Sequence, residues 1–178
     1  FGSSLFHYSM KDYYSEVSYG ALSLSSGPTW TGWYKTTGTH NSYAAAIPGK
    51  ADANNAQFVY DAVHQADLAG FDFSGYDLDG DCHVDVVAVV HQGTGQETSG
   101  IATDIWSHRS SLSSLLSSGS YTTNSNCIAG GKMIVDDYII MPEKSSATAI
   151  STIGVFAHEF GHALGLPDLY DKDGTSEG

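Results

Sequence analysis

The segment that most constrains the fold of this chain is FAHEFGHALGLPDLYD, at residues 156–171. Its two histidines, His158 and His162, lie four residues apart. Residues at this spacing project from the same face of an α-helix, one turn above each other. We therefore predict a helix over about residues 150–164 that holds both imidazole rings side by side. A separate apolar stripe would anchor this helix to a core and contains Ile153, Ala157, Phe160 and Leu164.

The residues that follow this helix predict a sharp turn. Gly165 can adopt the left-handed conformation that often ends a helix. Pro167 prevents the helix from resuming and favours an extended residue before it. The turn would bring the carboxylate of Asp168 back toward the two histidine rings. Two imidazole nitrogens and one carboxylate oxygen form the ligand set of a catalytic zinc site, in which a fourth position stays open for water.

Glu159 directly follows the first of these histidines. One residue of helix rotates the side chain by about 100°, so Glu159 should flank a bound metal ion without binding it. From there it can accept a proton from a metal-bound water and pass it to a leaving amine, while the ion polarises the scissile carbonyl. These roles together describe hydrolysis of a peptide bond. The alternative is a helix that contains these residues by chance.

A second group of carboxylates precedes a predicted strand. The sequence DLDGDCHVD places four of them at positions 1, 3, 5 and 9 of a loop similar to a calcium loop, namely Asp77, Asp79, Asp81 and Asp85. Hard oxygen donors suit Ca²⁺. An EF-hand has glycine at position 6 and glutamate at position 12, where this chain has Cys82 and Ala88, so the loop is not a true EF-hand. We predict a structural Ca²⁺ here, and the alternative is a solvated acidic turn.

Helix and strand patterns alternate along the rest of the chain. Residues 52–69 predict a long amphipathic helix. Residues 86–90 form an apolar run typical of a strand buried on both faces, and residues 131–143 predict another strand. The Ser-rich residues 107–126 predict a long surface loop. This interleaving favours an α+β fold with a mixed α/β lobe.

Two further predictions concern the ends of this pattern. The N-terminal region predicts a short helix up to Val17 and a strand at residues 19–26. The sequence YIIMPE, at residues 138–143, would line the cleft as an edge strand that pairs with an extended substrate.

Composition narrows the range of partners. The formal net charge is −13 with seven Lys plus Arg, so there is no basic stripe to neutralise phosphates and we expect no nucleic-acid partner. No apolar run approaches the ~20 residues of a membrane-spanning helix. The acidic, lysine-poor composition favours a secreted protein. In that setting Cys82 and Cys127 would form one disulfide, and the alternative is two separate buried thiols.

The sequence HEFGHALGLPDLYD resembles the active site of family M6 metallopeptidases, the immune-inhibitor-A-like secreted bacterial proteases. That family has the pattern H-E-x-x-H-x-x-G-x-x-D, with aspartate as third zinc ligand where metzincins usually have histidine. The sequences GDCHVDVVAVVHQGTGQE and DIWSHRS are also similar, so the resemblance spans about residues 58–178. It implies a zincin-like or metzincin-like catalytic domain with a twisted mixed sheet, a backing helix and an active-site helix. By this similarity, Glu159 is the general base and the zinc ligands are His158, His162 and Asp168.

The resemblance also predicts the domain organisation. We expect residues 1–178 to be a single metallopeptidase catalytic domain, or its N-terminal part. Metzincin-like enzymes have a methionine turn downstream of the third ligand, whereas the methionines of this sequence all precede the histidine helix, at Met10, Met133 and Met141. We therefore expect the lower subdomain to be largely missing, with a C-terminal remainder of the same protease following a truncation or nick after residue 178.

Together these observations predict a secreted, extracellular zinc-dependent endopeptidase that acts on protein or peptide substrates, with Zn²⁺ as cofactor and Ca²⁺ as a structural ion. Two alternatives remain: a non-catalytic, metal-stabilised binding or adhesion module on the same scaffold, and a zinc hydrolase restricted to glycosylated proteins. The intact Glu159 argues against the first, because a module that needs only the metal has no use for a base.

Overall fold

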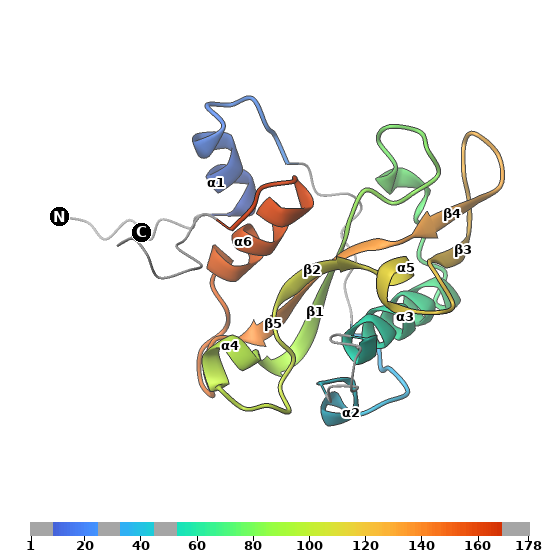
Figure 1. Cartoon of the computed structure of the whole chain (residues 1–178). Helices are drawn as coiled ribbons and strands as arrows, with labels where there is room; N and C mark the ends of the chain where they lie inside the picture. Colours follow the sequence, from blue (N-terminus) through green and yellow to red (C-terminus); the bar gives the residue numbers. More distant parts are fainter. Residues whose placement is uncertain (1–8, 25–32, 45–52, 169–178) are drawn as a thin grey trace.

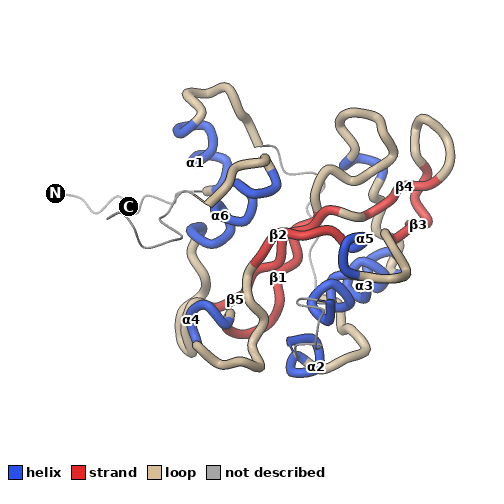
Figure 2. Tube along the Cα trace, in the orientation of Figure 1, coloured by secondary structure: helices blue, strands red, loops and turns tan. Residues whose placement is uncertain are grey.

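The computed structural model describes residues 9–24, 33–44 and 53–168. Over these residues the chain has an α+β fold, as the sequence predicts, with a small mixed sheet between helices (Figures 1 and 2). Figure 1 shows α6 (Ile153–Ala163) and α1 (Met10–Val17) on one side of the sheet and α3 (Ala53–Leu68) on the other. Both long predicted helices are therefore confirmed, as is the short helix that ends at Val17. The predicted strand at residues 19–26 does not form over residues 19–24, and its last two residues lie outside the described ranges.

The central sheet has three strands in the order β1-β5-β2, with bounds β1 (Val87–Thr94), β5 (Asp137–Lys144) and β2 (His108–Ser111). β1 runs parallel to β5, with Val89 opposite Ile140. β2 runs antiparallel to β5, with Arg109 opposite Ile139. The prediction that residues 138–143 form an edge strand is therefore wrong. Residues 138–142 are nearly inaccessible, Glu143 is half-buried, and β5 has a strand on each side, so β2 takes an edge position.

The Ser-rich residues 107–126 are not a loop. They form β2, the short helix α5 (Leu112–Leu115) and the strand β3 (Tyr121–Asn126). The reason is that sparse apolar side chains are placed where they can be buried: Leu112 is fully buried and Tyr121 nearly so. The high serine content therefore obscured the apolar pattern of this segment, which depends on a few large side chains. The prediction for residues 86–90 also needs correction, since burial alternates along β1 and Val90 is exposed.

A second, two-stranded sheet pairs β3 with β4 (Lys132–Val135). The predicted disulfide is present here and joins Cys82 to Cys127, with a Cα–Cα distance of 5.4 Å. It ties the acidic loop before β1 to the turn between β3 and β4. Nearby, the buried Asp67 of α3 accepts hydrogen bonds from the Tyr121 hydroxyl at 2.9 Å and the Asn124 backbone at 2.9 Å.

The remaining elements are short: α2 (His40–Ala44), α4 (Gln96–Ser99) and the 3₁₀ turn η1 (Ser74–Tyr76). In the part of the chain that the structure describes, no helix has both the length and the apolar character to cross a bilayer.

Replacing both Cys82 and Cys127 by serine is expected to lower the free energy of unfolding by about 4 kcal/mol, because a loop spanning 45 residues is no longer closed in the unfolded chain. Urea denaturation measures this difference. Wild-type protein under reducing conditions serves as the control and should unfold together with the double variant. Equal midpoints for oxidised wild type and the variant would show that the bond does not stabilise the fold.

Candidate metal centre

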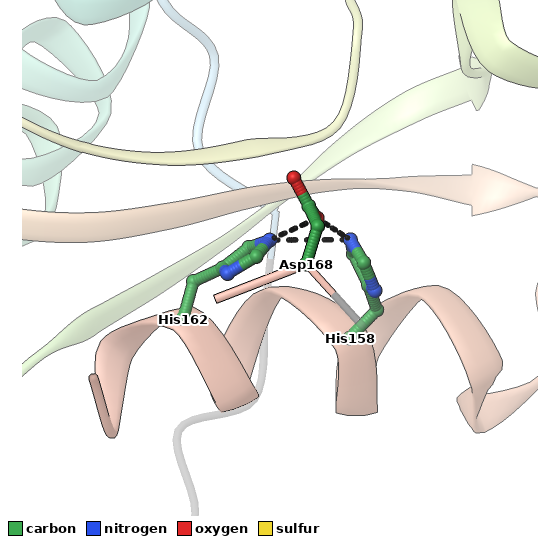
Figure 3. A group of neighbouring side chains, drawn as sticks. All are labelled: His158, His162 and Asp168. Atoms are coloured by element: carbon green, nitrogen blue, oxygen red, sulfur yellow. Dashed lines mark hydrogen bonds and ion pairs between the residues drawn. The ribbon is translucent and has the colours of Figure 1, made fainter. Parts of the chain in front are cut away.

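The helix α6 ends as its sequence predicts. Gly165 has a φ of +87°, in the left-handed region, and its N–H donates to the carbonyl of His162 at 3.0 Å. The next N–H, of Leu166, donates to the carbonyl of Gly161 at 3.0 Å. These two bonds satisfy carbonyl groups at the helix end and reverse the chain direction. Asp168 follows this turn and lies beside the two histidines (Figure 3).

Three ligand atoms converge in this turn. The Nε2 atoms of His158 and His162 are 3.2 Å apart. Asp168 Oδ1 lies 3.2 Å from His158 Nε2 and 3.1 Å from His162 Nε2. Figure 3 shows both rings rising from the same face of α6 toward the carboxylate. The structure thus brings together all three residues that the sequence singles out as zinc ligands.

The spacing fits one zinc ion. Ligand atoms at the corners of a tetrahedron, each ~2.0–2.1 Å from the metal, are about 3.3 Å from one another. The contacts of the ligand side chains with their surroundings also fit a zinc site. His162 Nδ1 lies 2.8 Å from the carbonyl oxygen of Leu166. A ring that donates its Nδ1–H to a carbonyl presents the lone pair of Nε2 to a metal. The side chain of His158 is 43% exposed, so the site is open to solvent on one side.

Glu159 lies beside this group but belongs to a different environment. It is only 5% exposed, although it is charged in water. Burial raises the pKa of Glu159 to about 7. The charge of His162 opposes this rise, whereas the charges of Glu97 and Asp168 add to it. The backbone of Arg109, on β2, acts in the opposite direction and lowers the pKa of Glu159. Glu159 therefore points toward the sheet edge while remaining within reach of the ligand charges.

The sequence reasoning missed the residues that position this sheet edge. Both carboxylate oxygens of Glu97 accept hydrogen bonds from Ser107, at 2.7 Å from its hydroxyl and 3.2 Å from its backbone N–H. Ser107 is buried and directly precedes β2. The contact thus connects α4 to the strand that touches Glu159. The only sequence signal was that both residues lie in stretches similar to family M6.

The acidic loop is partly assembled. Carboxylate oxygens of Asp77, Asp79 and Asp85 lie within 4.8 Å of one another. Asp81 is not part of this group, and its carboxylate accepts from the backbone N–H of His83 at 2.7 Å. Three of the four predicted carboxylates therefore gather, while the tight turn directs Asp81 toward the backbone of His83, and the role of Asp81 as a calcium ligand stays a prediction. Cys82 has a φ of +70°, which provides the left-handed residue that glycine supplies in an EF-hand.

Electrostatic repulsion acts within this group. Removal from water raises the pKa of Asp85, and the carboxylates of Asp79, Asp77 and Asp81 raise it further. Asp77 offsets part of the repulsion by accepting backbone hydrogen bonds, including one from Gly80 at 2.7 Å. A bound cation would offset the remaining repulsion between these carboxylates.

Two other histidines carry no ligand set among the described residues. His91 is 1% exposed on β1, with its Nδ1 at 3.1 Å from the carbonyl of Gln92. His108 lies on β2, with its Nε2 at 3.2 Å from the Tyr138 hydroxyl. His108 is accounted for by packing and hydrogen bonding to its neighbours, whereas His91 Nε2 is buried without a hydrogen-bond partner among the described residues.

Comparison with known proteins agrees with this geometry. The chain is 36% identical to immune inhibitor A of Bacillus thuringiensis subsp. alesti over 94% of its length, and 32% identical to the pre-pro-metalloprotease PrtV of Vibrio cholerae over 96%. It spans about a quarter of the first relative and a fifth of the second, at 26% and 20%. Residues 3–178 match the family model described as immune inhibitor A peptidase M6, catalytic domain. The chain therefore belongs to peptidase family M6.

Proposed function

We propose that this chain is the catalytic domain of a secreted zinc-dependent endopeptidase. The observation that carries the proposal is the convergence of His158 Nε2, His162 Nε2 and Asp168 Oδ1, at 3.1–3.2 Å from one another, beside the buried Glu159. Membership of a family of peptidases supports it, as does the name metalloprotease given to the PrtV relative. Secretion is supported by the Cys82–Cys127 disulfide, since such bonds persist mainly outside the cytosol.

The three ligand residues would hold the metal through two neutral imidazoles and one carboxylate. When bound, zinc supplies a Lewis acid that activates a water molecule and polarises the scissile carbonyl. The accessible side chain of His158 marks the side from which substrate approaches. Because the ligands come from one helix and the turn that ends it, their spacing depends on few backbone torsions.

Glu159 would act as the general base and then as the general acid. Its carboxylate accepts a proton from the attacking water and delivers it to the amine of the leaving peptide. The backbone of Arg109, on β2, would help to orient the carboxylate during this transfer. Burial of the side chain keeps bulk water from competing for its hydrogen bonds.

Substrate would bind along β2. This strand is at the edge of the sheet, and its outer side has no strand partner among the described residues. An extended peptide could add there as a further strand through backbone hydrogen bonds. β2 thus replaces residues 138–143 as the candidate strand for substrate pairing. We further propose that residues beyond this chain complete the cleft, since the relatives are several times longer.

A non-catalytic binding module explains the site less well. Such a module needs the three ligands alone, whereas a carboxylate buried to 5% exposure costs free energy without serving a purpose. No feature of the described residues favours a restriction to glycosylated proteins.

Glu159→Ala in the full-length protein is expected to lower kcat/KM for casein by at least about a hundredfold, because a general acid–base contributes on that scale. Zinc content should stay near one per chain, since Glu159 is not a ligand. Glu16→Ala, at an exposed position on α1, is the matched control and should leave activity unchanged. Full activity of Glu159→Ala would exclude its role as the base.

Asp168→Ala is expected to weaken zinc binding by more than about a hundredfold, because only two imidazoles remain as ligands. This loss is larger than that caused by replacing a residue that only contacts a ligand. Competition with a chromophoric chelator measures the affinity. Zinc bound by the variant as tightly as by wild type would remove Asp168 from the ligand set.

We also propose a structural Ca²⁺ bound by Asp77, Asp79 and Asp85. Calcium at a hundred times its dissociation constant is expected to stabilise the fold by about 2.7 kcal/mol at fixed zinc. Thermal melts across a calcium titration measure the gain. Asp85→Asn should abolish it, whereas Asp72→Asn, outside the group, should not. A wild-type melting temperature that is independent of calcium would contradict the site.

A further inference from the structure

On the side opposite the sheet, α1 contacts α6 through a buried tyrosine (Figure 1). Tyr14, on α1, is 4% exposed. Its hydroxyl donates a hydrogen bond of 2.6 Å to the carbonyl oxygen of Ala157. Its ring lies edge-on to Phe160, with centroids 5.2 Å apart. These contacts join the N-terminal helix to residues 143 positions later in the chain.

The contacted carbonyl is directly connected to the metal centre. The carbonyl of Ala157 and the backbone nitrogen of His158 belong to one planar peptide unit. A hydrogen bond to that oxygen therefore restrains the peptide plane from which the first histidine projects. The bond is additional to the helix, since a carbonyl inside an α-helix already accepts from the residue four positions later.

Tyr14 and the sheet contact α6 on different sides. Helical geometry places Glu159 on one flank of the histidine face and Gly161 on the other, with Phe160 at the back. Glu159 contacts the backbone of β2, while Tyr14 covers Phe160 and Gly161. A Cβ added to Gly161 would lie 3.4 Å from the Tyr14 hydroxyl oxygen, at van der Waals distance, so this hydroxyl lies directly against the helix at Gly161. The helix cannot rotate about its axis without breaking one of these contacts.

We propose that Tyr14 is a positioning residue for the metal centre: it sets the rotation of α6 and thereby the direction of the His158 and His162 rings. The inference rests on the proposed function of this site as a zinc centre. It gives one residue of the N-terminal helix a role in orienting the site, although no residue of α1 lies in the ligand set.

Tyr14→Phe tests this role in the full-length protein. The substitution keeps the ring on Phe160 and leaves no backbone group without a partner, so the fold should persist with a small change in melting temperature. Zinc affinity is expected to fall about tenfold, as for the weaker outer-shell changes at metal sites. In the same assay kcat for casein should fall with KM unchanged, because the ligands and base move while the substrate strand does not.

The neighbouring Tyr13→Phe is the matched control. Tyr13 packs edge-on against Tyr14 at 5.1 Å but is 37% exposed, and it should retain the wild-type zinc affinity. The absorption spectrum of the cobalt-substituted protein gives an independent measurement, since it reports ligand geometry and not stability. We expect a changed spectrum for Tyr14→Phe alone.

Wild-type zinc affinity and an unchanged cobalt spectrum in Tyr14→Phe would overturn the proposal. A wild-type protein that hydrolyses casein no faster than Glu159→Ala would instead refute the proposed function. The zinc and cobalt comparisons would still decide the role of Tyr14 in that case, because they do not depend on turnover.

Discussion

The packing of one amphipathic helix between a sheet and a second helix is the constraint on which the rest of this structure depends. α6 contacts β5 and β2 on one side and α1 on the other. Ala157 and Gly161 are buried in this packing, Leu164 at the helix end is 45% exposed, and the accessible His158 shares its face with His162. The ligands are thus directed by hydrophobic burial, a force that has no chemical relation to the metal they are proposed to bind.

Glu159 illustrates how the same packing assigns different chemistry to adjacent residues. His158 and Glu159 are neighbours in sequence, yet one is accessible and the other buried against β2. The step of about 100° per residue separates the proposed ligand from the proposed base. Burial then changes the protonation behaviour of the carboxyl, which an exposed glutamate would not show. The family to which the chain belongs is named for peptidases, and this division of roles is what peptide hydrolysis needs.

Sequence patterns failed where few residues carried the signal. In residues 107–126 a serine-rich composition concealed β2, α5 and β3, because Leu112 and Tyr121 alone provide much of the burial. The sequence of β5 is compatible with a central or an edge strand, since apolar side chains occur at both positions. Strand order depends on backbone pairing between distant segments, and no local pattern reports it. The carboxylate of Asp81 accepts a hydrogen bond from the backbone N–H of His83 and does not gather with the other three carboxylates.

The sequence by itself determined the local arrangement of the site: histidines one helical turn apart, a glutamate beside them, a glycine break and a returning aspartate. These features follow from helix geometry and the conformational freedom of glycine, which act over a few residues. Only the tertiary structure decided which strand borders Glu159, which carboxylates of the acidic loop gather, and that Tyr14 reaches Ala157. Those contacts join residues far apart in the chain, and they depend on how whole elements pack to bury apolar surface.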